Sequence, residues 1–149
     1  MLNGPFTQKG TLFAKGSLPV LERMMAYGEE RNRIISHNIA NAQTRYYKTQ
    51  DTPDAEFHSL LEKSIKARDS KHVKTFEMFS NSEVYPEWQG NMHYRMHEPK
   101  QSILRHGDND VDMDREISKL TRNHLEYQTY ARLAKKQYEL IRSTIRETA

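Results

Sequence analysis

Residues 108–147, DNDVDMDREISKLTRNHLEYQTYARLAKKQYELIRSTIRE, decide the fold, because their pattern is typical of one long amphipathic helix. Apolar side chains recur at alternating spacings of three and four residues, which is the heptad pattern of a coiled-coil seam. Neither Gly nor Pro occurs within this stretch. Acidic residues at its start and Arg142 and Arg146 near its end suit the helix dipole, and Asp112 or Asp114 can cap it. The predicted seam comprises Ile117, Leu120, His124, Tyr127, Ala131, Ala134, Tyr138, Ile141 and Ile145, while Leu125, Leu133 and Leu140 widen the apolar face.

A second, weaker helix is predicted over residues 17–42. Ser17 is a plausible N-cap, and Pro19 is tolerated in the first turn. The same three-and-four spacing continues here, but Gly28 and Asn32 occupy seam positions, so the helix needs a partner surface to be stable. The predicted seam comprises Leu18, Leu21, Met25, Gly28, Asn32, Ile35, Ile39 and Ala42.

The two helices define the organisation of the whole chain. We expect a flexible leader over 1–16, the N-terminal helix over 17–42, and the C-terminal helix over 108–149. Residues 43–107 are expected to hold a loop, a short amphipathic helix over about 53–67, and a variable insert. The predicted fold is mainly α, a single domain with two long terminal heptad helices in a coiled-coil-like hairpin or bundle and a short irregular or weakly β insert. The helices can pair antiparallel within one subunit or pack against neighbouring subunits, and their long seams favour polymerisation.

Composition excludes several classes of protein. Hydrophobic residues make up 36% of the 149 residues, below the roughly 45–50% of ordinary compact domains, which argues against a deep enzyme core. The absence of cysteine excludes disulfides, thiolate nucleophiles and cysteine metal sites. No stretch approaches the roughly 20 apolar residues of a membrane span, and residues 1–9 lack the pattern of a signal peptide.

Two groups of residues suggest metal binding, and each lacks a required ligand. The run of alternating aspartates over 108–114 resembles a calcium loop, but Met113 and Lys119 stand where Gly and Glu are needed. His93 and His97 have the spacing of two zinc ligands, but the glutamate of the HExxH pattern is missing. We therefore interpret the aspartates as helix-capping groups and the histidines as solvated, and we expect no metal.

Catalytic and nucleic-acid functions have little support in the pattern. The chain has no Gly-rich phosphate loop and no GxSxG motif, so we expect no enzyme, no catalytic residue and no cofactor. Basic residues over 63–68 and 71–74 lie near Phe76 and leave a nucleic-acid module as one alternative. A soluble coiled-coil adaptor that binds a single helical partner is another. The heptad seams favour a third class, the structural subunit of a filament.

The end of the N-terminal helix carries a motif that resembles the signature of flagellar axial proteins, the rod and hook subunits. Asn38-Ile39-Ala40-Asn41 is intact, and Thr44, Tyr47 and Lys48 follow in the places that this family uses. Arg45-Tyr46 replaces the usual Pro-Gly. Asn side chains accept the left-handed conformation at a helix end and bond terminal backbone groups, so we expect Asn38 and Asn41 to end the helix and direct the chain toward Tyr47.

The C-terminal helix begins with a second signature, which is most similar to the small proximal rod subunits (B-type) of the flagellar basal body. Its matching residues include Val111, Asp112, Asp114 and Glu116. The resemblance implies a structural subunit that polymerises through its terminal helices and transmits torque. It further implies type III export without a cleaved signal, and a place in the periplasmic rod. The implied partners are other rod proteins, further copies of the chain, a rod-base adaptor near the membrane ring and the export apparatus, with no nucleic acid and no membrane insertion.

Overall fold

The computed structural model describes residues 16–70, 76–86, 92–98 and 109–147. It contains three helices, α1 (Leu18–Ala40), α2 (Asp54–Ser70) and α3 (Met113–Glu147), and two strands, β1 (Val84–Pro86) and β2 (Met92–Tyr94), among these residues. The strands pair antiparallel, with Tyr85 opposite His93. The prediction of a mainly helical fold with two long terminal helices and a small β insert is confirmed. The predicted leader lies outside the described residues, except for Gly16.

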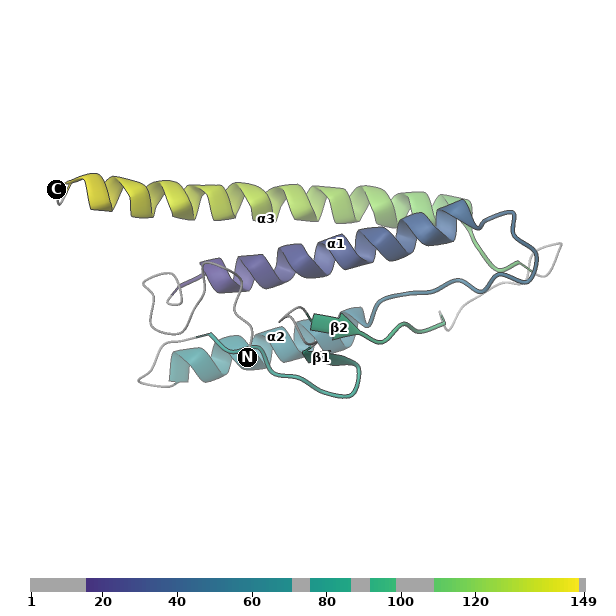
Figure 1. The fold of residues 1–149 in the computed structure, drawn as a ribbon, viewed down its shortest axis with the longest axis horizontal. Helices are drawn as coiled ribbons and strands as arrows, with labels where there is room; N and C mark the ends of the chain where they lie inside the picture. The colour runs from purple at the N-terminus through teal and green to yellow at the C-terminus, as the bar shows by residue number, and fades with distance from the viewer. Residues whose placement is uncertain (1–15, 71–75, 87–91, 99–108, 148–149) are drawn as a thin grey trace.

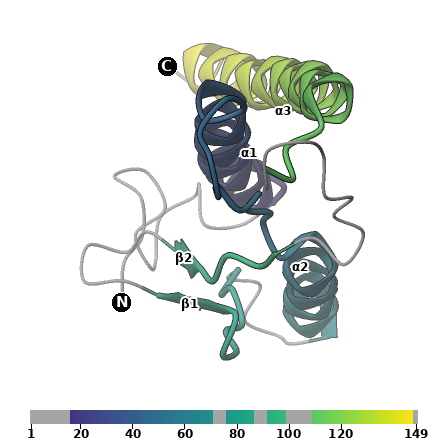
Figure 2. The ribbon, with the colours of Figure 1, turned by 90° about the vertical axis from the view of Figure 1, so that its right-hand side faces the viewer.

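Helix α1 lies in the middle of the molecule, with α3 on one side and α2 and the strands on the other (Figures 1 and 2). Helices α1 and α3 are antiparallel, since Asn38 bonds Glu116 at one end of the pair. At the other end, the Tyr138 hydroxyl lies 3.3 Å from the Glu22 carboxylate. Of the two arrangements that the sequence left open, the helix pair within one subunit is therefore present.

The contact between α1 and α3 is anchored near the start of α1. Leu18, Leu21 and Ala134 form a buried cluster, and Met25 and Tyr130 pack against it. Helix α3 has 35 residues and α1 has 23, so α3 continues past the first residue of α1 (Figure 1). The C-terminal turns of α3 therefore extend beyond the helix pair.

The larger hydrophobic cluster lies on the opposite side of α1. It joins α1 to α2 and the strands, and Tyr27 stacks on Phe57 with ring centres 3.9 Å apart. Tyr94 meets the Tyr27 ring edge-on at 5.1 Å. The members of this cluster are Tyr27, Phe57, Leu60, Leu61, Phe76, Val84 and Tyr94. Two faces of α1 are thus buried, which supplies the partner surface that its sequence requires.

The helix ends differ in how they are capped. Ser17 precedes α1, but its side chain makes no capping hydrogen bond, so the predicted side-chain cap is wrong. Leu21 N–H instead bonds the Ser17 carbonyl in the ordinary helical manner, at 3.0 Å. Asp112 precedes α3 and accepts a hydrogen bond from the Arg115 backbone N–H at 3.4 Å, as a capping residue does. Within the part of the chain that the structure describes, no helix has both the length and the apolar character to cross a membrane.

Candidate assembly surfaces and the junction that positions them

The Asn38 side chain, fully buried, lies where the end of α1 meets the start of α3. Its amide nitrogen donates to the Gln50 carbonyl at 2.7 Å and to Glu116 Oε2 at 2.9 Å. Its amide oxygen accepts from the Tyr47 hydroxyl at 2.8 Å and from the Gln50 backbone N–H at 3.1 Å. Two donated and two accepted bonds use the main hydrogen-bonding capacity of the amide. Asn38 therefore ties α1, the following loop and α3 together.

Glu116 brings a buried charge into this junction. Its side chain is 2% exposed, and Oε1 lies 2.9 Å from Lys119 Nζ. The same ammonium group lies 2.7 Å from Asp51 Oδ2. Asp51 in turn exchanges backbone hydrogen bonds with His97, which fixes the segment after β2 to the loop. The Glu116 charge is thus paired and hydrogen-bonded, as burial of a charge requires.

Asn109, which lies shortly before α3, donates hydrogen bonds to the segment at the end of α1. Its amide nitrogen lies 3.0, 3.1 and 2.7 Å from the carbonyl oxygens of Asn41, Ala42 and Thr44. Its amide oxygen accepts from the Val111 N–H at 2.8 Å. These carbonyls belong to the C-cap residue and to the turn after it, so Asn109 caps this end of α1 from outside the helix. The sequence pattern did not assign this capping role to Asn109.

Asp110 holds the loop at a second point. One carboxylate oxygen accepts from both the backbone N–H and the hydroxyl of Thr49, each at 2.7 Å. Burial, and then the carboxylates of Glu116 and Asp110, raise the pKa of Tyr47 above its usual value. The Tyr47 hydroxyl therefore stays protonated and able to donate to Asn38 at neutral pH.

The turn that leaves α1 is stabilised by local bonds. Asn41 follows the helix as its C-cap, and its amide donates to the His37 carbonyl at 2.9 Å. The Thr44 hydroxyl donates to Asn41 Oδ1 at 3.2 Å. Tyr46 then adopts φ of 61°, in the left-handed region. Among the remaining residues that resemble the family motif, Val111 is buried, Ile39 and Asp112 are half-buried, and Ala40, Lys48 and Asp114 are exposed.

The seam residues of α1 lie largely inside the molecule. Leu18, Leu21 and Ile35 are buried, whereas Met25, Ile39 and Ala42 are half-buried and Asn32 is exposed. Gly28 is buried opposite α3, and its carbonyl accepts from the Asn123 amide at 2.9 Å. At this seam position the contact with α3 is therefore a hydrogen bond to the backbone rather than an apolar side-chain contact.

The seam predicted for α3 consists of two rows of residues, each with a spacing of seven, and only one of these rows faces α1. Ala134 is buried, and Leu120, Tyr127 and Ile141 are half-buried. In the other row His124 is exposed, Ala131 is half-buried, and Ile117, Tyr138 and Ile145 are 49%, 37% and 56% exposed. The residues that precede this row, Glu116, Asn123 and Tyr130, are buried or half-buried in its place.

Three leucines lie on the outward side of α3. Leu125, Leu133 and Leu140 are 59%, 47% and 53% exposed. We expected them to widen the face that packs on the partner helix, but the structure places them in solvent. A row of exposed leucines along one helix is typical of a surface that another protein covers.

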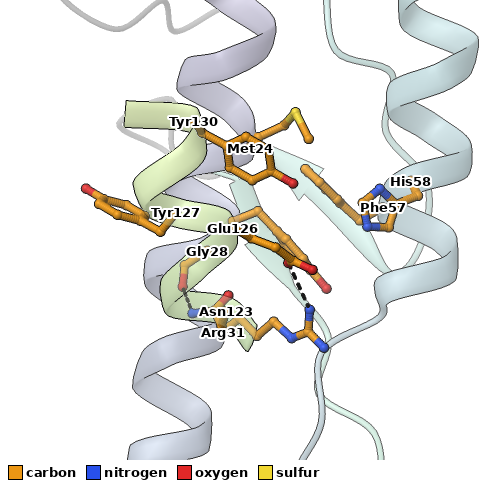
Figure 3. A pocket seen from close by; sticks show the side chains of 10 residues that line it. Met24, Gly28, Arg31, Phe57, His58, Asn123, Glu126, Tyr127 and Tyr130 are labelled. Carbon is orange, nitrogen blue, oxygen red and sulfur yellow. Dashed lines mark hydrogen bonds and ion pairs between the residues drawn. The ribbon is translucent and has the colours of Figure 1, made fainter. Parts of the chain in front are cut away.

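A shallow groove lies between α1, α2 and α3, with about 300 Å³ of empty space that includes open solvent (Figure 3). Arg31 reaches across it, pairing with Asp54 at 2.8 Å and with Glu126 at 3.8 Å. These ion pairs and the Asn123–Gly28 bond hold the three helices together. We therefore interpret the groove as a seam of the fold rather than a ligand site.

The motifs that suggested metal or nucleic-acid binding have other contacts. His93 lies on β2 beside the Tyr85 ring, at 4.9 Å between ring centres, and His97 Nε2 lies 2.8 Å from Glu83 Oε2. No cluster of three or more His, Asp or Glu side chains able to hold a metal ion occurs in the described ranges. On α2, Lys66 pairs with Glu62.

No protein-family model matches the chain. The chain is 29% identical over 105 residues to the flagellar basal body rod protein FlgB of Aquifex aeolicus (strain VF5), across 70% of this chain and 73% of that protein. It is 27% identical over 119 residues to the flagellar basal body rod protein FlgB of Bacillus subtilis (strain 168), across 76% of this chain and 80% of that protein. Each similarity spans more than two thirds of both proteins, so it is not confined to one motif.

Proposed function

We propose that the chain, which belongs to the family of flagellar basal-body rod proteins, assembles into the proximal rod through its two terminal helices. It is a structural subunit of the basal-body rod and not an enzyme. The family membership implies association with other rod proteins in the basal body.

The row of exposed leucines on α3 carries this proposal. The inward row of α3 packs on α1, so the helix pair already satisfies the seam that lies within one subunit. Leu125, Leu133 and Leu140 face away from that contact and are about half exposed. Because each leucine is about half exposed, covering all three with a neighbouring subunit would contribute about half of the roughly 1.5–3 kcal/mol that a fully buried side chain gives, or a few kcal/mol in total.

The length of α3 supports the same surface. Its C-terminal turns continue past the start of α1 (Figure 1), so α1 does not cover the end of α3. We propose that these turns pack against a neighbouring subunit and that torque passes through this helix contact. The α1 seam and the inward row of α3 hold the subunit together, and the outward side of α3 is assigned to assembly in this proposal.

The specific binding partners are proposed from the family membership. They are further copies of the chain, a rod-base adaptor near the membrane ring, and the type III export apparatus that delivers the subunit. A soluble adaptor that binds one helix would use the same leucines but would not be incorporated into the rod. Fractionation of isolated basal bodies therefore separates the two functions.

Substitution of the outward leucines tests the proposal. We expect Leu133→Asp or Leu140→Asp to abolish rod incorporation and motility while leaving secretion nearly normal. Both side chains are about half exposed in the subunit, so its free energy of unfolding should fall by only about 1–2 kcal/mol, through lost leucine contacts and weaker helix propensity. The rod, in contrast, would have to bury an unpaired charge.

Lys135→Asp is the matched control, because Lys135 is exposed on the same helix and pairs only loosely with Glu139, at 3.9 Å. Its effect on incorporation should be mild. Circular dichroism of each purified variant verifies its fold. Normal rods in both leucine variants, or equal loss in all three, would contradict the proposed interface.

A further inference from the structure

The turn after α1 presents Tyr46 in a conformation that a bulky residue avoids. Its φ of 61° makes it the one non-glycine residue with positive φ among those described. The Cβ and backbone of L-residues crowd each other there, whereas glycine adopts the same angles without strain. The Tyr46 side chain is 65% exposed, so burial within the subunit does not offset the strain. The fold therefore holds an aromatic residue with a strained backbone conformation in solvent.

Neighbouring contacts hold the turn in one position. The Asn109 amide donates to the Thr44 carbonyl at 2.7 Å, and the Tyr47 N–H bonds the same carbonyl at 3.3 Å. On the other side of Tyr46, the Tyr47 hydroxyl is bonded to the buried Asn38 amide. Both flanks of Tyr46 are thus fixed to the junction. An aromatic side chain on a fixed turn loses less conformational entropy on binding than one on a mobile loop.

Arg45 adds a cation to this exposed ring. Its guanidinium carbon lies 5.5 Å from the centre of the Tyr46 ring, within the range of a cation–π contact. Tyrosine and arginine are the residue types that most often carry the binding energy of a protein interface. Strained residues persist where the surrounding structure enforces them, and such positions cluster at functional sites.

We propose that Arg45 and Tyr46 form a second docking point of the rod subunit, at the end of the helix pair, for an acidic surface of a neighbouring rod subunit. The partner offers a carboxylate to the Arg45 guanidinium and an apolar patch to the Tyr46 ring. Arginine pairs with carboxylates through two parallel hydrogen bonds, and Lys48, also exposed in this segment, adds to the positive charge. The turn lies at one end of the long molecule, whereas α3, the helix with the outward leucines, runs along its side (Figure 1). It therefore suits a contact between subunits that follow one another.

This inference rests on the proposed function, and one set of variants tests it separately. Tyr46→Gly removes the strain and the ring together. We expect the purified variant to melt a few degrees higher than the wild type, while the ratio of rod-incorporated to secreted protein falls about tenfold. Tyr46→Phe keeps the ring and should incorporate nearly as the wild type does. Arg45→Ala should lower incorporation without raising the melting temperature.

Each other outcome overturns a defined part of the inference. A Tyr46→Gly subunit that melts higher and still incorporates normally excludes the docking role. A Tyr46→Gly subunit that melts no higher removes its structural premise. Leu133→Asp, measured in the same cells, distinguishes the two proposals. If it blocks incorporation and Tyr46→Gly does not, the docking role of the turn fails alone, whereas normal incorporation of both variants contradicts the lateral interface as well.

Discussion

Substitution of Asn38 by alanine removes the side chain that joins the two ends of the chain. Its amide makes four hydrogen bonds, and their loss has unequal consequences. Glu116 Oε2 loses a donor inside the protein, where its carboxylate is 2% exposed, and a lost bond to a charged group costs about 1.5–3 kcal/mol. The Gln50 backbone groups can bond water instead, because that residue is exposed. The Tyr47 hydroxyl keeps its contact to the His37 ring at 2.9 Å.

We therefore expect Asn38→Ala to lower the free energy of unfolding by about 3 kcal/mol, most of it from Glu116. For a chain of this size that corresponds to a fall in melting temperature of about 6–12 °C. Thermal and urea unfolding of the purified subunit, followed by circular dichroism, measures both quantities.

Asn41→Ala is the matched control, since it deletes the same amide from the same motif. The Asn41 amide bonds the His37 carbonyl in an exposed position, so its loss should cost only about 0.5–1 kcal/mol. If the two variants lose equal stability, the buried network around Asn38 does not contribute as described. An Asn38→Ala subunit as stable as the wild type would refute the reasoning directly.

Three further results are expected. Burial raises the pKa of Tyr27 and of Tyr94 well above the ordinary value. The free energy of unfolding should therefore be at its full value below pH 10 and fall above it, by about 1.4 kcal/mol per pH unit for each group. Tyr27→Phe should make this fall less steep in alkaline titrations. Gly28→Ala places a methyl group 3.5 Å from Tyr127, which is an ordinary contact. Because alanine has the better helix propensity, the free energy of unfolding should rise by up to about 1 kcal/mol. A large loss of stability in urea unfolding would contradict that packing. Asn41→Ala should impair rod incorporation more than secretion, whereas an equal fall of both would identify the segment as an export signal.

The heptad spacing predicted both terminal helices but not which side of α3 meets α1. A pattern of apolar residues selected Ile117 and His124, whereas the structure turns Glu116 and Asn123 inward. Those polar side chains are buried because α1 offers them partners, Asn38 for Glu116 and the Gly28 carbonyl for Asn123. Hydrophobicity alone cannot identify a polar residue whose partner lies on another helix.

Gly28 shows the same limit from the other side of the contact. In the sequence it interrupts the predicted seam and weakens the expected helix. In the structure it lies opposite Asn123 and Tyr127, and its carbonyl accepts the Asn123 amide, so the position contributes a contact without an apolar side chain. The contact between Gly28 and Asn123 joins two helices that are far apart in the sequence, so it follows only from the packing of α1 on α3.

The polar junction was partly predictable. Asparagines at a helix end are a recognised capping signal, and the sequence predicts that Asn38 and Asn41 both end the helix. Asn41 does so as the C-cap, whereas Asn38 lies inside α1 and its amide bonds Gln50, Tyr47 and Glu116 instead. The capping of the same end by Asn109 joins residues about 65 positions apart, as in its bond to Thr44. Its place next to an acidic helix start was visible, but local preference gives no information about so distant a partner.

The most direct test of the central claim is a cross-link from the outward face of α3 in isolated basal bodies. Because the chain has no cysteine, Leu133→Cys introduces a single reactive thiol at one known place. A thiol-directed photoactivatable cross-linker attached there should join the subunit to another rod protein or to a second copy of the chain. Absence of the subunit from basal bodies, or cross-links to a single soluble partner alone, would contradict the account.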